Sequence, residues 1–174
     1  MPLEPSSSRE AFRGRLIRVV VEDWPEGERE IVRHPGAAAI VAFDGDDVVL
    51  VRQLRQSIRA EMLEIPAGVL DVDGESPIDC AIRELREETG YVAANVVPLG
   101  AIHPSPGFSD ERIDLFTGQA TAESDHEEGI DVVRMRFTDA LRAVGDGTIT
   151  DGKTVAALLL AAGRRASHDG ASPA

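Results

Sequence analysis

The sequence predicts an α/β protein in which helices pack on a mixed β-sheet that follows an N-terminal β-meander. Alternating and β-branched apolar runs dominate residues 14–55, and one strongly capped amphipathic helix follows at residues 76–90. Further apolar runs and a last helical segment come after it. The order of strands, helix, strands and helix favours a mixed sheet with helices on it. A length of 174 residues suits one domain with one substantial core.

The first segment, residues 1–34, is expected to form paired strands. The runs "GRLIRVVVEDW" and "EIVRHP" flank the turn sequence "EGER", which is typical of a hairpin or meander. The first dozen residues and the end "RRASHDGASPA" are rich in Ser, Pro, Gly and Ala, so we expect both ends to be frayed. The chain is therefore divided into a strand segment at 1–34, a main domain at 35–165 and a flexible tail at 166–174.

The main domain begins with two predicted strands in "GAAAIVAFDGDDVVLVRQLR". They are joined by "DGDD", and Asp-Gly between apolar runs is a strong indication of a hairpin turn. After the central helix, the runs "NVVPLGAIH", "RIDLFTGQA" and "IDVVRMRF" are predicted strands, and "DGKTVAALLLAAGRRA" is the last predicted helix.

The clearest helix lies in "ESPIDCAIRELREETGY". Ser76 can cap its N-terminus, Pro77 suits the first helical position, Asp79 completes a capping-box pattern and Gly90 ends the helix. The lone cysteine, Cys80, has no intramolecular disulfide partner and is expected to be a small buried hydrophobe on the apolar face.

Composition excludes several classes of function. The net charge is −13, with 31 acidic and 18 basic residues, which argues against nucleic acid as a partner. No apolar run approaches the roughly 20 residues of a membrane-spanning helix, and no secretory signal is evident. We therefore expect a cytoplasmic protein without a membrane span. An acidic protein that acts on an anionic substrate needs local arginines or a divalent cation.

Three glutamates, Glu84, Glu87 and Glu88, fall on one face of the central helix. Like charges at these spacings repel each other, so a compensating group is expected. A hard cation such as Mg²⁺ would provide it, since Mg²⁺ binds carboxylate oxygens. The alternative is a solvated acidic face that pairs with Arg83 and Arg86.

The segment "GVLDVDGESPIDCAIRELREETGY" resembles the Nudix box, G-x5-E-x7-R-E-U-x-E-E-x-G-U with U a bulky apolar residue. The opening Gly68 lies one residue too far from Glu75, which implies a one-residue loop insertion, and Tyr91 fills the last apolar position imperfectly. The resemblance implies a Nudix-type α/β/α sandwich and the hydrolysis of nucleoside diphosphates linked to another moiety. The positions that match at the expected spacing are Glu75, Arg83, Glu84, Leu85, Glu87, Glu88 and Gly90.

The flanking sequences are similar to the ADP-ribose pyrophosphatase branch of this family. "LEIPAG" precedes the box, and Pro106 follows Gly90 by sixteen residues, close to the spacing of the branch's own proline. "TITDGKTVAALLL" also resembles the terminal helix of that branch, so the resemblance covers about residues 29–160. It implies Mg²⁺ as the metal, for which Mn²⁺ can substitute, and a nucleoside diphosphate sugar as the substrate.

Metal and catalytic roles carry over by position. Glu84 and Glu88 are expected as the principal metal ligands with the carbonyl of Ala67, while Glu87 ligates a further ion or acts through water. Arg83 is expected to orient these carboxylates and to pair with Glu75, as groups that support metal ligands commonly do.

The general base is expected in the acidic loop "ESDHEEGIDV". We favour Glu127 as the base and Glu128 as a further metal ligand, although an alignment shift of one residue exchanges them. Glu123, Asp125 and His126 are other candidates in the same loop, and a solvated acidic turn is the alternative to any role.

Substrate contacts are expected from several segments. Arg52 and Arg55 can supply positive charge to the diphosphate or be surface arginines, and Glu64 can accept hydrogen bonds from ribose hydroxyls or from arginine. In the resembled branch an N-terminal segment is exchanged between subunits of a homodimer and helps to hold adenine, which points to Arg29. Trp24 is expected to pack in the core or at a dimer interface. His103 is expected to be a histidine at the end of a strand without a role in binding. The loop expected at the terminal ribose contains Pro106, Gly107, Phe108 and Ser109.

The leading hypothesis is Mg²⁺-dependent cleavage of ADP-ribose to AMP and ribose 5-phosphate. Another nucleoside diphosphate sugar, such as a GDP-hexose, is the alternative within the same chemistry. A non-catalytic ADP-ribose-binding sensor is a third possibility, although such domains tend to lose the box glutamates that this sequence retains.

Overall fold

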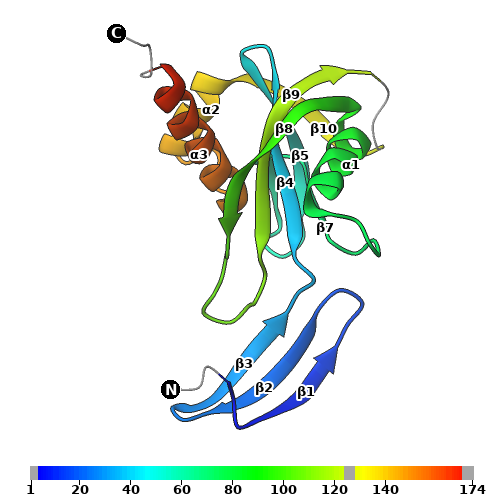
Figure 1. The fold of residues 1–174 in the computed structure, drawn as a ribbon, viewed down its shortest axis with the longest axis vertical. Helices are drawn as coiled ribbons and strands as arrows, with labels where there is room; N and C mark the ends of the chain where they lie inside the picture. Colours follow the sequence, from blue (N-terminus) through cyan, green and yellow to red (C-terminus); the bar gives the residue numbers. More distant parts are fainter. Residues whose placement is uncertain (1–3, 124–127, 170–174) are drawn as a thin grey trace.

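The computed structural model describes residues 4–123 and 128–169 (Figure 1). Within these ranges a three-stranded sheet precedes a seven-stranded sheet that carries three helices. This arrangement confirms the predicted α/β class. None of the described helices is both long enough and apolar enough to cross a membrane.

The N-terminal sheet is an antiparallel meander of β1 (Ser7–Arg13), β2 (Arg18–Trp24) and β3 (Gly27–Arg33), as predicted. The expectation that the first dozen residues are frayed is wrong for residues 6–12, whereas residues 1–3 lie outside the described residues. β1 pairs with β2, and Ser6 donates from its backbone N–H (2.8 Å) and its hydroxyl (3.0 Å) to the carbonyl of Asp23. Every side chain of β1 is exposed. Backbone pairing therefore holds this strand, and an apolar periodicity could not reveal it.

The larger sheet has the order β10-β5-β4-β9-β8, with β6 added to β5 and β7 added to β4. β4 and β9 run parallel while the other pairs are antiparallel, so the sheet is mixed, as predicted. Gly45 and Asp46 form the two-residue turn expected between the first two strands. The strands are β4 (Ala37–Asp44), β5 (Asp47–Arg55), β6 (Ala60–Glu64), β7 (Ala67–Val69), β8 (Tyr91–Ile102), β9 (Ile113–Ala122) and β10 (Asp131–Arg136).

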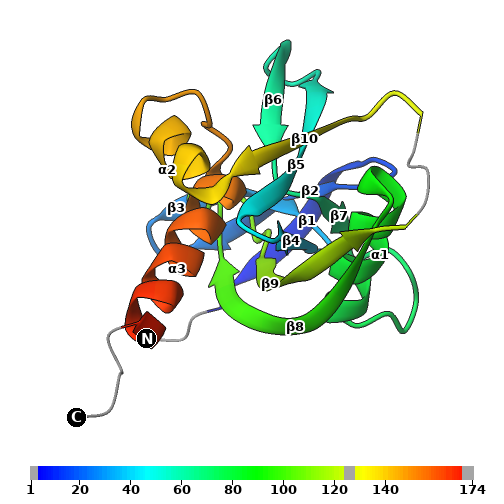
Figure 2. The ribbon, with the colours of Figure 1, turned by 90° about the horizontal axis from the view of Figure 1, so that it is seen from above.

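Helices cover both faces of this sheet, which gives an α/β/α sandwich (Figures 1 and 2). α1 (Pro77–Thr89) lies on one face, and α2 (Phe137–Gly145) and α3 (Gly152–Asp169) lie on the other. The central strand β4 is buried from Ala37 to Phe43, and its alternate side chains enter the two cores. Its uninterrupted apolar sequence follows from burial on both faces.

The ends of α1 are as predicted. The hydroxyl of Ser76 accepts a hydrogen bond from the backbone N–H of Asp79 (3.3 Å) and donates one to its carboxylate (2.5 Å). Gly90 ends the helix at φ 71°, a left-handed conformation that glycine adopts readily. Cys80 is fully buried against the sheet, as expected.

Two helical segments differ from the expectation. α2 was not predicted. The ring of Phe137 packs edge-to-face on that of Phe43, with 5.1 Å between the ring centroids, and secures the helix to the sheet. Residues 166–169 of the expected tail continue α3, and residues 170–174 lie outside the described residues. The Ser-rich end reads as a tail in isolation, but it continues a helix whose earlier turns are packed on the core.

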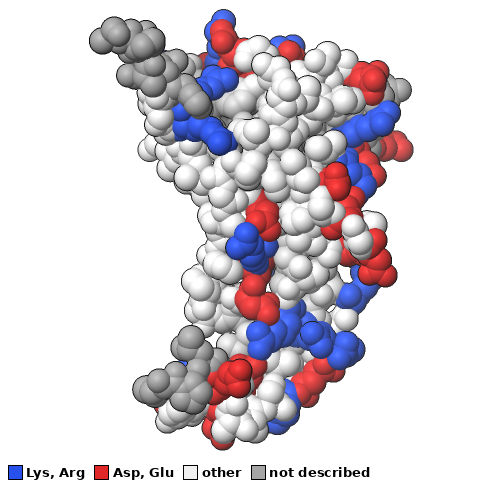
Figure 3. Space-filling model, in the orientation of Figure 1, with Lys and Arg blue, Asp and Glu red and all other residues white. Residues whose placement is uncertain are grey.

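The three-stranded sheet is attached to the main domain through the loop between β8 and β9. The backbone N–H of Val32 donates to the carbonyl of Phe108 (2.7 Å), and that of Asp110 donates to Val32 (3.1 Å). The carboxylate of Asp110 accepts hydrogen bonds from the backbone N–H of His34 (2.8 Å) and from Arg33 (2.9 Å). Figure 3 shows basic and acidic side chains side by side at this junction.

The pKa of Asp110 lies below its ordinary value. Desolvation raises the pKa, but the hydrogen bond from His34 and the contact with Arg33 outweigh that effect. A carboxyl whose folded-state pKa is depressed stabilises the fold above its unfolded-state pKa, and this contribution is lost as the pH falls through the folded-state value. The attachment of the N-terminal sheet should therefore weaken in acid.

We predict that Asp110→Asn lowers the free energy of unfolding by about 1–2 kcal/mol at neutral pH, because it removes a charged hydrogen-bond acceptor. Amide hydrogen exchange should increase in β1–β3 more than in β4. The difference from the unsubstituted protein should shrink below about pH 4.

Asp46→Asn is the matched control, since Asp46 makes an exposed ion pair with Arg136 at 3.1 Å. It should change stability by less than about 0.5 kcal/mol. Equal exchange in β1–β3 for both variants would show that Asp110 does not hold the sheet.

Candidate active site

Arg83 of α1 gathers three glutamates. Its Nε and Nη2 atoms bind the carboxylate of Glu75 at 2.8 and 3.0 Å, which confirms the predicted pair. Its Nη1 atom donates to Glu84 (2.6 Å) and Glu87 (2.9 Å). These contacts, led by the one with Glu75, raise the pKa of Arg83 further above its ordinary value. One guanidinium thus offsets part of the repulsion among the carboxylates of this helix.

Glu88 points from α1 toward the start of β7 and is 7% exposed. One carboxylate oxygen accepts a hydrogen bond from the backbone N–H of Ala67 (3.2 Å), and the other accepts one from the side-chain amide of Gln53 (2.9 Å). Burial raises the pKa of Glu88 to about 7, although both hydrogen bonds oppose the shift. A buried carboxyl with only neutral partners is therefore held beside β7.

Glu84 rests directly on the backbone of Gly68. A Cβ atom added to Gly68 would lie 2.0 Å from the Glu84 carboxylate, so any other residue at this position would force that carboxylate to move. Burial raises the pKa of Glu84, and Arg83 partly opposes this shift. Glu84 and Glu88 are thus not on a solvated face, whereas the side chain of Glu87 is 54% exposed.

The donor atoms beside β7 suit a hard divalent cation. Glu84 and Glu88 supply carboxylate oxygens, and Ala67 and Gly68 supply backbone against which both carboxylates lie. Across residues 4–123 and 128–169, however, no group of three or more His, Cys, Asp or Glu side chains lies close enough to hold a metal. The three glutamates of α1 are therefore divided. Glu84 and Glu88 face β7, whereas Glu87 is exposed and shares Arg83 with Glu84.

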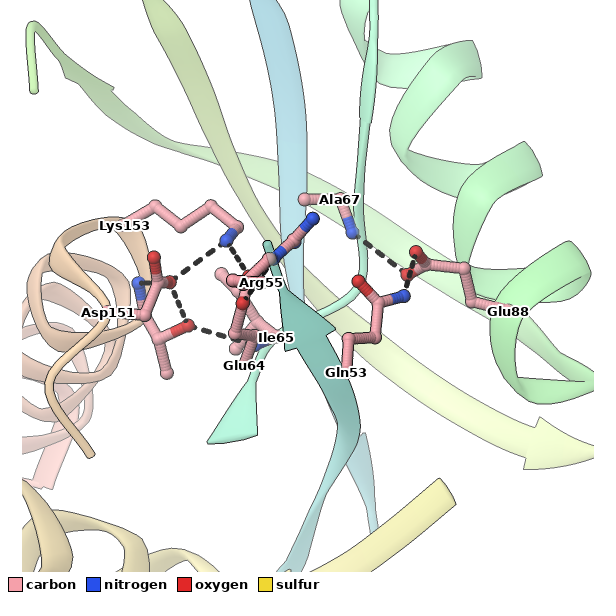
Figure 4. Close-up of polar contacts among 9 residues, drawn as sticks. Gln53, Arg55, Glu64, Ile65, Ala67, Glu88, Asp151 and Lys153 are labelled. Carbon is pink, nitrogen blue, oxygen red and sulfur yellow. Dashed lines mark hydrogen bonds and ion pairs between the residues drawn. The ribbon is translucent and has the colours of Figure 1, made fainter. Parts of the chain in front are cut away.

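Positive charge lies on the other side of β7, around the buried Glu64 (Figure 4). Arg55 donates from Nε and Nη2 to the two oxygens of Glu64, both at 2.6 Å, and Lys153 binds the same carboxylate. Lys153 also contacts Asp151 at 3.0 Å. Desolvation raises the pKa of Glu64, but Arg55 and Lys153 outweigh it and hold the pKa below its ordinary value. Of the two partners proposed for Glu64, the structure shows arginine.

A cavity of about 460 Å³ lies between these two groups. One part of its wall is the backbone of Ala67 and Gly68, behind which Glu88 and Glu84 lie. Another part consists of Glu64 and the cations that bind it. The lining residues are His34, Ala37, Arg55, Ser57, Ile58, Met62, Glu64, Ala67, Gly68, Val69, Pro104, Glu111, Ile113, Asp151, Gly152 and Lys153.

Several residues expected at the substrate do not line this cavity. Arg29 lies in β3 and donates to the carbonyls of Gly27 and Glu28. Arg52 lies in β5, 3.7 Å from Asp131. Pro106 and Ser109 line a different cavity, next to Trp24.

The loop that contains Pro106, Gly107, Phe108 and Ser109 instead pairs with β3, where Ser109 forms a bridge with Val32. Phe108 is 56% exposed. His103 lies just after β8 and contacts the carbonyl of Glu111 at 3.1 Å, as a strand-end histidine would.

The acidic loop is only partly described. Glu127, together with Asp125 and His126, lies outside the described residues. Glu128 is exposed in the turn that precedes β10. Glu123 lies 3.5 Å from Arg86 in an exposed ion pair.

Sequence analysis missed Gln53, Asp151 and Lys153. Gln53 lies between Arg52 and Arg55 in "VRQLRQ", and Lys153 lies in the "TDGKT" that opens the last helix. The first segment indicated a role only for its arginines, and the second only a helix that resembles the terminal helix of the branch. A polar residue at the end of an apolar strand and a lysine in the first turn of an apolar helix were the available indications of a role.

Comparisons with known proteins agree with this architecture. A family model described as the NUDIX domain matches residues 32–158. An ADP-ribose pyrophosphatase of Bacillus subtilis (strain 168) is 37% identical over 164 residues, which cover 87% of this chain and 88% of the relative. A GDP-mannose pyrophosphatase of Yersinia enterocolitica is 34% identical over 142 residues, or 73% of each chain.

A solved structure described as an ADP compounds hydrolase has the same fold. Its TM-score is 0.77, and the alignment covers 98% of this chain and 97% of that one at 23% identity. The family model spans most of the chain, including the box glutamates and the cavity wall beside them. The chain therefore belongs to the Nudix family.

Proposed function

We propose that this protein hydrolyses the pyrophosphate bond of ADP-ribose to AMP and ribose 5-phosphate. The observation that carries the proposal is one cavity whose wall joins two parts of the site. One part is the backbone of Ala67 and Gly68, which supports the carboxylates of Glu88 and Glu84, and the other contains Arg55 and Lys153. Such a cavity suits an anionic substrate that binds with a divalent cation. The similarity to the Bacillus subtilis ADP-ribose pyrophosphatase favours this substrate.

We assign Mg²⁺, replaceable by Mn²⁺, to Glu84, Glu88 and the carbonyl of Ala67, with Glu87 and Glu128 as further ligands. When bound, the cation supplies Lewis-acid stabilisation of the phosphoryl oxygens. The roles of the chain's own residues follow from their contacts. Gln53 and the N–H of Ala67 fix the rotamer of Glu88, and Arg83 fixes Glu84 and Glu87.

In the proposed reaction, water attacks one phosphorus atom and the bond to the bridging oxygen breaks. Glu127 accepts the proton of the attacking water, and Arg55 binds the diphosphate through the edge of its guanidinium that Glu64 leaves open.

We assign Arg29 and the loop at 106–109 to contacts with the substrate that is bound in a second copy of the chain. Arg29 belongs to the N-terminal sheet, and the loop pairs with that sheet. This assignment makes the protein a homodimer. A different nucleoside diphosphate sugar is the second candidate substrate, because the GDP-mannose pyrophosphatase is 34% identical over 73% of the chain.

Product analysis tests the substrate. Purified protein with Mg²⁺ should form AMP from ADP-ribose faster than it cleaves an ADP-hexose, GDP-mannose or NADH. Glu88→Gln should lower kcat more than about 100-fold, since even groups that only support metal ligands cost 10–100-fold.

Asp139→Asn is the control for a change from carboxylate to amide, because Asp139 pairs with Arg142 on the surface of α2. It should retain full activity. Preferential cleavage of GDP-mannose would show that ADP-ribose is not the preferred substrate. Full activity of Glu88→Gln would show that Glu88 has no role in catalysis.

Metal binding can be measured without turnover. After treatment with EDTA, added Mg²⁺ should raise the Tm of the unsubstituted protein, because a ligand that binds only the folded state stabilises it. Glu84→Gln and Glu88→Gln should respond much less, whereas Asp139→Asn should respond like the unsubstituted protein. Equal Tm increases in all four proteins would place the cation elsewhere.

Gly68→Ala tests the contact between β7 and Glu84. The added methyl group would overlap the Glu84 carboxylate, so we expect kcat/KM to fall about 10- to 100-fold as that carboxylate moves. Gly163→Ala is the control, because its Cβ would meet open space in α3 and should be neutral or stabilising by about 0.5–1 kcal/mol. Full activity of Gly68→Ala would show that the position of Glu84 is not critical.

A further inference from the structure

Lys153 is a nearly buried lysine that binds two carboxylates next to Arg55. Its side chain is only 10% exposed, and its ammonium contacts two carboxylates, Glu64 and Asp151. A buried ammonium between two carboxylates is strongly held in place. Lys153 also lines the cavity that Arg55 and the backbone of Ala67 and Gly68 line.

Arg55 is held on one side only. Glu64 occupies its Nε and Nη2 atoms, and no described residue accepts a hydrogen bond from Nη1. In Figure 4 the guanidinium extends from Glu64 toward Ala67, the side of β7 where Glu88 is bound. The open edge of Arg55 thus faces the space between the cationic and carboxylate groups.

A chain of hydrogen bonds connects Lys153 to the backbone at Ile65, just before β7. Asp151 accepts hydrogen bonds from the N–H (3.0 Å) and the hydroxyl (2.6 Å) of Thr154. The same hydroxyl accepts one from the N–H of Ile65 (2.9 Å), two residues before Ala67. The start of α3 is thereby tied to the segment that leads into β7.

Charge gives Lys153 a second effect. Arg55 and Lys153 balance Glu64 and Asp151, so the group of four is neutral. Without the ammonium, two carboxylates would face one guanidinium, and Asp151 or Glu64 would compete with an incoming anion for it. The ammonium therefore leaves Arg55 free to bind an added anionic group.

We propose that Lys153 is a positioning residue that acts through Glu64 to direct Arg55 at the diphosphate, and so sets substrate affinity rather than the rate of bond cleavage. This inference rests on the proposed function, since it takes a nucleoside diphosphate sugar as the ligand.

The test compares Lys153→Met, Lys153→Arg and Arg164→Met. Arg164 is the matched control because it is a cation of the same helix that binds the carbonyl of Pro98, outside the cavity. Three quantities are measured for each: kcat and KM for ADP-ribose, and the Kd of an ADP-ribose analogue whose phosphorus atoms are joined by CH₂. Thermal unfolding of each variant shows whether it is folded at the assay temperature.

Lys153→Met should raise KM and Kd about tenfold or more, with kcat within about threefold of the unsubstituted enzyme, since uniform binding is lost. Lys153→Arg should recover most of the affinity, and Arg164→Met should leave both constants unchanged. A fall in kcat at constant KM and Kd, or an equal effect of Arg164→Met, would overturn the proposal.

A double-mutant cycle tests whether Lys153 acts through Arg55. In an Arg55→Met background, Lys153→Met should weaken binding of the analogue much less than it does alone, because coupled residues are not additive. Multiplicative effects would show that Lys153 acts independently and would overturn the positioning role.

The Kd of the analogue tests this proposal independently of the proposed function. If the protein binds the analogue but does not hydrolyse ADP-ribose, the proposed function is wrong, and the Kd values of the Lys153 variants still test the positioning role. Failure of the unsubstituted protein both to bind the analogue and to hydrolyse ADP-ribose would overturn both proposals.

Discussion

The contact between α1 and β7 is the constraint on which the rest of the site depends. A helix that carries charged residues packs against a strand whose Gly68 has no side chain, and the space that glycine leaves is filled by the carboxylate of Glu84. One helical turn later, Glu88 meets the N–H of Ala67. The helix cannot lie this close to the strand without burying both carboxylates. Burial raises the pKa of each, which makes a nearby positive charge favourable.

The protein uses cations in two different ways around this contact. Arg83 is saturated by three glutamates, so it orders the helix face and has little capacity left for a ligand. Arg55 is held along one edge only and keeps the other edge open to the cavity. The difference arises from position. Arg83 lies within the carboxylate cluster, whereas Arg55 ends a strand opposite a single buried carboxylate that Lys153 shares.

Local patterns predicted α1 and its caps because Ser76, Pro77 and Gly90 act within a few residues of one another. The pair of Glu75 and Arg83 followed from the same motif. The role of Glu64 stayed open, since its arginine partner lies on a neighbouring strand and its lysine partner 89 residues away. β1 left no apolar periodicity in the sequence, because backbone pairing alone holds it. α2 does carry apolar residues at helical spacing, among them Phe137, Ala140 and Val144, but it directly follows a strand and is only nine residues long, so the sequence does not distinguish it from a connection to the last helix.

The loop between β8 and β9 connects the two sheets to the cavity, which explains why its sequence suggested substrate contact. Phe108 and Asp110 hold β3, while Pro104 and Glu111, at either end of the same loop, line the cavity. His34 extends the connection, because its backbone binds Asp110 and its side chain reaches the cavity wall. The N-terminal sheet therefore contacts the same loop that forms part of the cavity wall. Because the centre of this loop is bound to β3 and its ends line the cavity, the placement of the N-terminal sheet and that of the cavity wall depend on the same segment, although none of the described residues of β1–β3 lines the cavity.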